Sequence, residues 1–226
     1  MAEQSIPHDR VTRPLPEQAL QAVNAWNDRG YRVERYGESP SVVILGESHF
    51  NEDERAKQRE LLRMIRPEYM LHELGFGSMY NPKIGKYQRQ PNRTFDEFGY
   101  VEEVKPSVGD ELIAEADALG FTIIGCDLTN TEVGNVYPRV AALYPDQYIY
   151  DGSLRKIGNP TWKPTRQSEV IVPFREEFMV DMIHQYQQRS PKAIVAVMGR
   201  DHSDNIQTRG LLQSKGFDYV YVDQVR

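Results

Sequence analysis

SVVILGESHF at residues 41–50 joins a short apolar run to a Gly-Glu-Ser-His corner, and this stretch decides the fold. The run 41–45 contains two valines and an isoleucine, and it lies between Pro40 and Gly46, which predicts a buried strand. The polar residues that follow Gly46 therefore stand where a buried strand leaves its sheet.

The residues after this corner predict a helix and a second strand. Asn51 with Glu54 three residues later is a capping-box-like start, and apolar residues recur at helical spacing until a proline stops them. Residues 69–71 then predict a strand that ends in His72 and Glu73. Because a strand, a helix and a strand in one sheet usually form a right-handed parallel crossover, this unit predicts a parallel sheet.

A second unit of the same kind closes the chain. Residues 193–198 predict a strand, Asp204 is expected to cap a helix, and residues 219–222 predict another strand. Between the first strand and the helix stands a second corner, GRDH at 199–202.

The two units match in sequence. GESH at 46–49 aligns with GRDH at 199–202, and the strand that ends at Glu73 aligns with the strand that ends at Asp223. Agreement at both the corner and the acidic strand end predicts an internal duplication.

The remaining residues predict more helices, one more strand and two long loops. The predicted elements are a helix over 16–29, a helix over 109–119, a strand over 121–126 that ends at Asp127, and a long helix after Pro173. Residues 76–108 and 128–167 are expected to be loops that lie over the site. The predicted fold is a single α/β domain over 16–226, with a central, mostly parallel sheet flanked by helices and built from two similar halves with long loop insertions. A flexible arm over 1–15 precedes it.

The composition argues against several classes of protein. Lys and Arg number 27 and Asp and Glu number 33, and the net charge of -6 makes nucleic acid an unexpected partner. The apolar runs are only strand-sized and the first residues lack the pattern of a secretion signal, so we expect a cytoplasmic protein without a membrane span. Cys126 is the single cysteine, which excludes intrachain disulfides and thiolate-rich metal sites. Any metal would be held by His, Asp or Glu.

Ionisable residues gather at the predicted carboxyl ends of the strands. In an open parallel sheet the loops at these ends converge on one edge, where ligands bind. The residues at these ends include three of the five histidines and are Glu47, His49, His72, Glu73, Asp127 and His202. The sequence therefore predicts one polar site at this edge.

The direction of the side chains separates these residues further. Glu47 and His49 are two residues apart and point to one side if the chain stays extended, whereas His72 and Glu73 must point to opposite faces. Glu73 is favoured for the site because the repeat places Asp223 opposite it. His72 is expected to support the site or the structure.

Each corner places a histidine, His49 or His202, just before a predicted helix N-terminus. The partial positive charge there favours a bound anion or a metal-bound hydroxide and disfavours protonated imidazole. Neutral imidazole is the form that acts as a metal ligand or as a general base. Arg175 shares the buried stripe of the helix after Pro173, so we expect it to pair with a carboxylate in the site or on the substrate.

Five motifs together resemble the superfamily that joins erythromycin esterase-like, ChaN-like and TraB/Tiki proteins. They run from about residue 41 to residue 223 and are GESH at 46–49, HE at 72–73, GCD at 125–127, REEFMV at 175–180 and GRDH at 199–202. The resemblance implies an α/β sandwich of two similar halves, with a polar site formed by the Glu and His of the first motif, the second acid and the last His. Glu176 stands where the family usually has Asp, and Cys126 precedes the family's strand-ending Asp. Macrolide ester hydrolysis, metal-dependent peptide cleavage and haem or iron binding all occur among such proteins, so membership would leave the reaction open.

Our leading hypothesis is a hydrolase of ester or peptide bonds. Its reactive centre is expected to be formed by Glu47, His49, Glu73 and His202. In the favoured, metal-dependent form these side chains and Asp127 hold Mn, Zn or Fe, which lowers the pKa of a bound water to about 7. In the metal-free form His49, oriented by a carboxylate, deprotonates water, and Arg175 or His202 stabilises the oxyanion.

The competing hypothesis is a protein that binds haem or iron in the same pocket without catalysis. The expected partner is a small-molecule or peptide substrate, with neither nucleic acid nor a membrane. The sequence leaves open whether the protein forms a homodimer.

Overall fold

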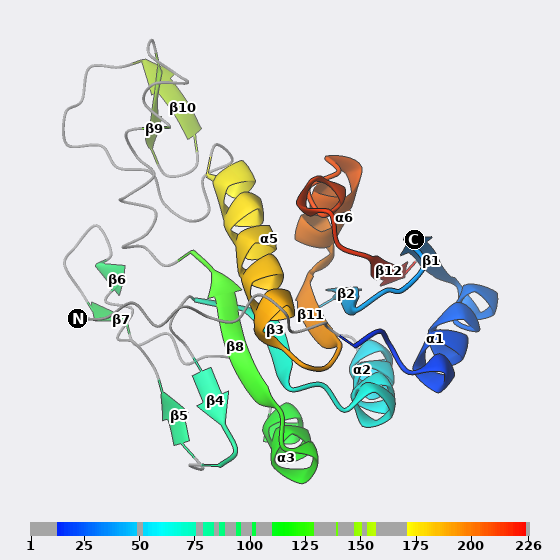
Figure 1. Cartoon of the computed structure of the whole chain (residues 1–226). Helices are drawn as coiled ribbons and strands as arrows, with labels where there is room; N and C mark the ends of the chain where they lie inside the picture. The colour runs from blue at the N-terminus through cyan, green and yellow to red at the C-terminus, as the bar shows by residue number, and fades with distance from the viewer. Residues whose placement is uncertain are drawn as a thin grey trace, which may run out of the picture.

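An eight-stranded sheet forms the centre of the protein (Figure 1). The computed structural model describes residues 13–48, 52–75, 79–83, 86–88, 94–95, 101–102, 110–128, 139, 147–150, 153–156 and 171–224. The strands of the sheet are β1 (Tyr31–Tyr36), β2 (Val42–Glu47), β3 (Tyr69–Gly75), β4 (Met79–Asn81), β5 (Lys86–Gln88), β8 (Thr122–Asp127), β11 (Ile194–Gly199) and β12 (Tyr219–Gln224). Two further pairs of strands are β6 (Thr94–Phe95) with β7 (Val101–Glu102) and β9 (Gln147–Tyr150) with β10 (Ser153–Lys156). The helices are α1 (Glu17–Asn24), α2 (Glu52–Ile65), α3 (Asp110–Leu119), α5 (Val172–Arg189) and α6 (Arg200–Thr208), with 3-10 turns η1 (Asn27–Arg29) and η2 (Gln213–Lys215).

The sheet is mostly parallel. Its strand order is β1-β12-β2-β11-β3-β8-β4-β5, and the five neighbours from β12 to β8 all run parallel. Strand β1 at one edge and strands β4 and β5 at the other are antiparallel. The predicted α/β fold with a mostly parallel sheet flanked by helices is confirmed.

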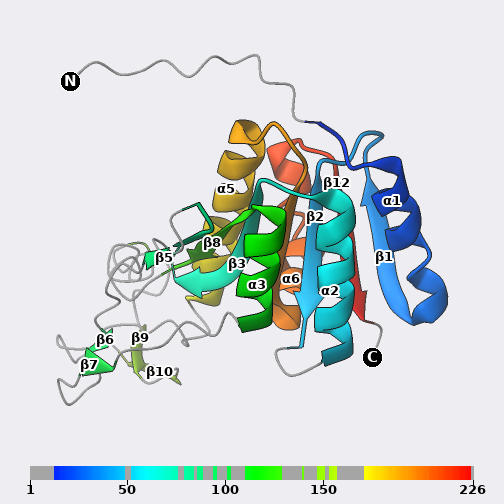
Figure 2. The same ribbon diagram turned by 90° about the horizontal axis from the view of Figure 1, so that it is seen from below.

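Helices cover both faces of the sheet (Figures 1 and 2). Helices α1, α2 and α3 pack on one face, where Val43 and Leu45 of β2 join the core. Helices α5 and α6 pack on the other face, where Val42 and Ile44 of the same strand are buried. Because alternate residues of β2 enter different cores, the whole strand is apolar, as expected for a strand buried on both faces.

The two sequence units occupy equivalent places in the sheet. Strands β2 and β11 lie side by side, β12 flanks β2 and β3 flanks β11, so a half-turn about an axis between β2 and β11 exchanges the units. The half-turn also exchanges the faces, since Leu45 packs on the α2 side and its counterpart Met198 packs on the α6 side. The carboxyl ends of both central strands therefore lie together at one edge.

The register of the sheet corrects one detail of the sequence match. Met70 of β3 pairs with Val195 of β11, and Tyr219 of β12 pairs with Val42 of β2. Because the alignment of the two corners makes Val42 and Val195 equivalent, Met70 is equivalent to Tyr219. Counting along the strands, Glu73 is then equivalent to Val222 and not to Asp223. The predicted equivalence of Glu73 and Asp223 is therefore wrong by one residue. The prediction aligned the two acidic strand ends, and such an alignment does not detect a shift of one residue, although that shift exchanges the two faces of a strand.

The predicted helix over 16–29 is interrupted. Helix α1 ends at Asn24, and η1 follows and ends at Gly30, whose φ of 83° is readily adopted by glycine. The side chain of Asn27 accepts a hydrogen bond from the Val33 N–H at 3.0 Å and so ties the turn to β1. Strand β1 was not predicted, because its charged residues follow the pattern of an exposed edge rather than of a buried strand.

Helix α6 begins five residues earlier than predicted. Its N-cap is Gly199, whose φ of -53° and ψ of 141° let the chain pass directly from β11 into the helix. Asp204 therefore lies inside the helix, where it pairs with Arg32 at 3.1 Å, and it does not cap the helix as expected. His202 consequently lies in the first turn of α6 rather than before it.

The predicted arm and long loops fall largely outside the described residues. The description begins at Arg13, and Leu15 is already buried, with its N–H donating to the Pro40 carbonyl at 2.7 Å. Within the predicted loop 76–108, β4 adds to the main sheet beside β8. No helix in the described part of the chain has the length and apolar character needed to cross a membrane.

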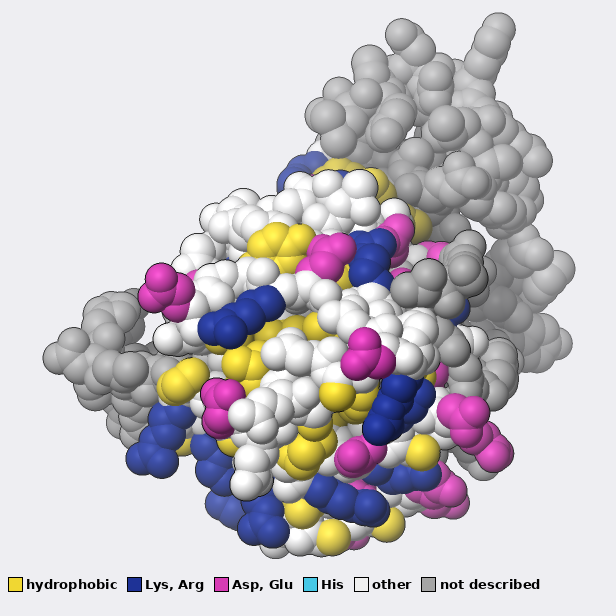
Figure 3. Space-filling model, turned by 90° about the vertical axis from the view of Figure 1, so that its right-hand side faces the viewer, with side chains coloured by type: hydrophobic (Ala, Val, Ile, Leu, Met, Phe, Trp, Pro, Cys, Tyr) yellow, Lys and Arg dark blue, Asp and Glu magenta, His cyan; other side chains and the backbone are white. Residues whose placement is uncertain are grey.

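Charged side chains of both signs are scattered among apolar and uncharged ones on the face shown in Figure 3. On the edge strand β1, Arg32 pairs with Glu34 at 2.9 Å. Charges along an exposed edge strand discourage pairing with another sheet.

The first test concerns the close approach at Gly46. A Cβ at this residue would lie 2.4 Å from Ser203 Oγ and 3.0 Å from Asp223 Oδ1, so the corner of β2 needs glycine for α6 to pack on it. We expect Gly46→Ala to lower the free energy of unfolding by about 1–3 kcal/mol, measured by urea denaturation. The double variant Gly46→Ala/Ser203→Ala should recover part of this loss, compared with Ser203→Ala alone. Full stability of Gly46→Ala would contradict the close packing.

Candidate functional site

Glu73 lies at the centre of a buried cluster at the carboxyl edge of the sheet. Its Oε1 accepts a hydrogen bond from Arg175 Nη2 at 2.9 Å, and its Oε2 accepts one from the Gly199 N–H at 2.7 Å. His202 Nε2 lies 3.4 Å from Oε1, and the side chains of Glu73 and His202 are each 12% exposed. Strands β3 and β11 and helices α5 and α6 therefore meet at one carboxylate.

Arg175 joins Glu73 to Asp127. It lies in the first turn of α5, and its Nε and Nη2 donate to the two carboxylate oxygens of Asp127 at 3.0 Å and 2.8 Å. Asp127 ends β8 and is completely buried. Burial opposes the charge of Arg175, but the hydrogen bonds and negative charges of Asp127 and Glu73 outweigh it and raise the pKa of the guanidinium above its ordinary value. Two carboxylates thus hold one cation at the strand ends.

His202 lies between two carboxylates. Its Nδ1 is 3.3 Å from Glu176 Oε1, on the side of the ring away from Glu73. Glu176 is 1% exposed and also accepts hydrogen bonds from Asn205 Nδ2 and Arg209 Nη1, each at 2.8 Å. Burial raises the pKa of Glu176, but the hydrogen bonds from His202, Asn205 and Arg209 outweigh burial and lower it below its ordinary value. Glu176 is therefore a buried carboxylate that keeps its charge.

Glu176 is a candidate that sequence reasoning missed. It was noted only as a departure from the family pattern, although a usable signal was present. Met179, Val180 and Ile183 stand three, four and seven residues after it and are all buried. The same helical spacing that singled out Arg175 therefore also places Glu176 on a buried face.

Glu47 and His72 form a separate contact group on the α2 side of the sheet. Glu47 Oε2 accepts a hydrogen bond from Gln58 of α2 at 2.8 Å, and its Oε1 lies 3.8 Å from His72 Nε2. His72 and Glu73 point to opposite faces of β3, as alternation requires. Glu47 pairs in register with Gly199, whose N–H binds Glu73, so the two acids stand on either side of the same edge.

Ionic contacts join the two glycine corners. Arg200 of the second corner donates to Glu54 of α2 and to Asp223 of β12, both at 2.8 Å. The other carboxylate oxygen of Glu54 accepts the N–H of Ser48, in the first corner, at 2.6 Å. Arg200 of the second corner is therefore tied to α2 of the first unit and, through Glu54, to Ser48 of the first corner.

The predicted site residues thus fall into groups. Glu73, Asp127, Arg175 and His202 come together, while Glu47 contacts Gln58 and His72. His49 lies outside the described residues. Within the described residues no three His, Cys, Asp or Glu side chains are arranged to hold a metal.

Three of the predicted metal ligands, Glu73, Asp127 and His202, do not fit a cation in this cluster. Glu73 and Asp127 already pair with the Arg175 guanidinium, and a second positive charge at the same oxygens would be repelled. His202 lies beside Glu176, whose carboxylate already accepts hydrogen bonds from Arg209 and Asn205. The cluster is therefore arranged around a guanidinium rather than around a metal ion.

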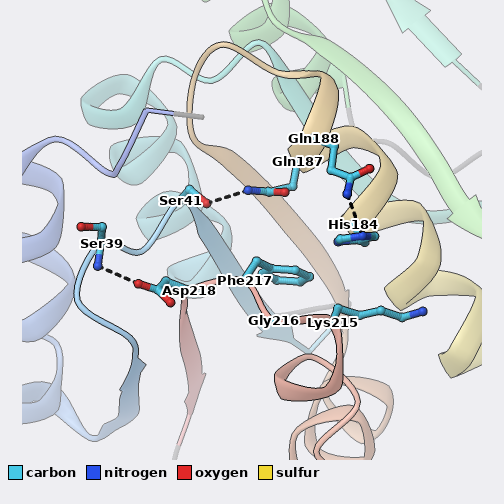
Figure 4. Close-up of a pocket in the computed structure, with 9 residues that line it drawn as sticks. All are labelled: Ser39, Ser41, His184, Gln187, Gln188, Lys215, Gly216, Phe217 and Asp218. Atoms are coloured by element: carbon cyan, nitrogen blue, oxygen red, sulfur yellow. Dashed lines mark hydrogen bonds between the residues drawn. The ribbon is translucent and has the colours of Figure 1, made fainter. Parts of the chain in front are cut away.

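A hollow of about 480 Å³ lies at the other end of the strands, away from this cluster (Figure 4). It is lined by residues that precede β2 and β12 and by the last turns of α5, and Figure 4 shows Ser39 and His184 on opposite sides. The His184 ring stacks on Phe217 with centroids 5.8 Å apart. None of the predicted site residues lines this hollow.

Comparison of the chain with family models, with curated proteins and with solved structures gave no match. Function is therefore inferred from the arrangement of the side chains and from the sequence motifs.

The buried guanidinium gives a test of stability. We expect Arg175→Met to lower the free energy of unfolding by about 3–5 kcal/mol, because it leaves the Asp127 and Glu73 carboxylates without their cation. Arg59→Met is the control, since Glu111, its partner, is 73% exposed and the pair should contribute at most about 1 kcal/mol. Urea denaturation measures both. Equal losses in the two variants would contradict the importance of the buried contacts.

The lowered pKa of Glu176 gives a test of pH dependence. The ordinary value is 4.5, and a group whose pKa is lower in the folded state stabilises the fold above the unfolded value and loses that effect as the pH falls through the folded value. The stability difference between wild type and Glu176→Gln should therefore be larger near neutral pH than at a pH below the folded value. Urea denaturation at several pH values measures it. Glu177→Gln, at the half-exposed neighbour, should show little pH-dependent difference.

Proposed function

We propose that the protein is a hydrolase of ester or peptide bonds that uses His202 as its general base. The observation that carries this proposal is the position of the His202 ring between the Glu176 and Glu73 carboxylates, at the carboxyl edge of a parallel sheet. An imidazole oriented by a buried carboxylate is the arrangement that activates water or another nucleophile in many hydrolases.

The contacts on the two ring nitrogens define the chemistry. Nδ1 lies 3.3 Å from the charged Glu176 carboxylate, so we assign the proton of the neutral ring to Nδ1, where Glu176 can accept it, and the lone pair to Nε2. Nε2 takes a proton from a water molecule as that water attacks the carbonyl carbon. The imidazolium that forms lies between Glu176 and Glu73 and is stabilised by both. It then returns the proton to the leaving group.

The charge of the cluster favours this proton transfer. Glu73, Asp127 and Glu176 carry three negative charges, and Arg175 and Arg209 carry two positive charges. With neutral imidazole the cluster has one excess negative charge, which protonation of His202 removes. The same charge would repel an anionic group next to the reacting bond, so we expect neutral or cationic substrates.

Arg175 acts through Glu73 in this proposal. Its Nε and Nη2 already donate to Asp127 and Glu73, so its role is to hold the Glu73 carboxylate beside His202. Glu73 also accepts the Gly199 N–H, which fixes it against the first turn of α6. His49 follows Ser48 in the first corner and remains the sequence's candidate for a second imidazole in this site.

The proposed substrate is a small molecule or a peptide, and the proposed location is the cytoplasm. Cys126, the single cysteine, is a free and buried thiol, as is usual for proteins of that reducing compartment. It takes the metal-free form of the hydrolase hypothesis. Binding of haem or iron in place of hydrolysis is an outcome of the same experiments.

Turnover of a panel of neutral and cationic esters and amides tests the proposal. We expect His202→Gln and Glu73→Gln each to lower kcat/KM by about 100-fold or more, because each removes a partner of the proton transfer. His184→Gln is the control, since its imidazole lies in the hollow at the other end of the strands and should leave turnover unchanged.

Two results would count against this mechanism. Unchanged turnover in His202→Gln would remove the general base. Loss of turnover with a chelator, restored by Mn, Zn or Fe, would favour the metal-dependent form instead. A Soret band on haem titration that disappears in His202→Gln, without turnover of any substrate, would favour the binding protein.

A further inference from the structure

We infer that Glu176 is a positioning residue that fixes both the orientation and the tautomer of the His202 ring. This inference rests on the proposed function, because the tautomer of His202 matters for catalysis only if His202 is the general base. The tautomer itself can be measured without a substrate. It assigns a role to a residue that the sequence motifs did not select, and it identifies the link between helix α5 and the reacting ring.

Glu176 is held more firmly than a surface acid would be. Its Oε2 accepts a hydrogen bond from Arg209 Nη1 and its Oε1 accepts one from Asn205 Nδ2, both at 2.8 Å. These donors belong to α6, whereas Glu176 belongs to α5, so the carboxylate is fixed between two helices. At 1% exposure it has almost no contact with solvent that would allow it to move.

The held carboxylate in turn restrains His202. Glu176 Oε1 lies 3.3 Å from Nδ1 in hydrogen-bonding geometry, whereas Glu73 Oε1 lies 3.4 Å from Nε2 as an ion-pair contact, so we assign the proton of the neutral ring to Nδ1. The ring is then oriented with Nε2 toward Glu73, 3.4 Å away. Without Glu176, the nearest carboxylate would be Glu73, and a hydrogen bond to Glu73 would favour the proton on Nε2. Nε2 would then be unable to accept a proton from water.

The charged groups around the ring come from each element packed against it. Glu73 faces it from β3, Arg175 and Glu176 come from α5, and Arg209 comes from α6 and acts on Glu176. Arg175 partly neutralises Glu73, and Arg209 partly neutralises Glu176. The choice between the two nitrogens therefore depends on which carboxylate makes the better hydrogen bond, and removal of Glu176 alone should reverse it.

A purely structural role for Glu176 makes a different prediction. If Glu176 only joined α5 to α6 through Arg209 and Asn205, its loss would lower stability without changing the protonation of His202. Stability alone does not separate the two roles, and the ring nitrogens of His202 have to be observed directly.

Long-range ¹H–¹⁵N NMR of the full-length protein labelled on histidine nitrogens makes this observation. The His202 signals are assigned by their loss in His202→Gln, which is needed because the chain has five histidines. In the wild-type protein above the titration range we expect Nδ1 to carry the proton. In Glu176→Gln we expect the Nε2-protonated form to rise to about half of the population or more, because an amide can turn either its oxygen or its nitrogen toward Nδ1.

Glu177→Gln is the matched control, with the same change at the next residue, and it should leave the His202 tautomer unchanged. Glu176→Asp keeps the charge and should give a tautomer population between those of wild type and Glu176→Gln, which also provides a test if Glu176→Gln does not fold.

The outcomes separate this inference from the proposed function. An unchanged His202 tautomer in a folded Glu176→Gln or Glu176→Asp protein would overturn the positioning role, whatever the activity. Unchanged turnover in His202→Gln would overturn the hydrolase mechanism while leaving the NMR result intact. With a substrate in hand, we expect Glu176→Gln to lower kcat more than it changes KM, since the ring would be misoriented while binding is retained.

Discussion

The arrangement of the site depends on the Glu73 carboxylate. It accepts hydrogen bonds from Arg175 and from the Gly199 N–H, and His202 lies against it. A carboxylate that is only 12% exposed is unfavourable unless it is compensated in this way, so the acid fixes the start of α5 and the start of α6 relative to β3. The positions of both helices at this edge, and hence of the side chains they carry, follow from satisfying one charge.

The topology of the sheet explains why such a charge can be satisfied there. Strands β2 and β11 lie side by side, and the second strand of each unit lies on the far side of the other unit's first strand. The carboxyl end of β3 therefore lies next to the corner of the second unit, and the end of β12 lies next to the corner of the first. Glu73 reaches Gly199, and Asp223 reaches Arg200 and lies close to Gly46. Two related units thus complete each other's corners while presenting different side chains.

The two units are not equivalent in chemistry. On the α5 side Glu73, Arg175, Glu176 and His202 share a network that could transfer a proton. On the α2 side Glu47 contacts Gln58 and His72, and Arg200 with Glu54 and Asp223 ties the corners together. Because the half-turn exchanges the faces of the sheet, equivalent strands expose different residues to helices of different sequence. In the mechanism that we propose, the α5 side transfers the proton and the α2 side supports the edge of the sheet.

The sequence by itself determined which strands and helices follow one another along the chain, that the central strands are parallel, and that acids and histidines stand at their carboxyl ends. These features follow from local apolar period, from glycine and proline at element ends, and from the geometry of parallel strands. The sequence also placed Arg175 on a buried helix face, where it pairs with two acids. Only the tertiary structure decided the face on which each acid lies, the start of α6 at Arg200, and the contact between Glu176 and His202. Strand register and helix packing set these features, and both depend on residues far apart in the chain, so a local pattern carries no record of them.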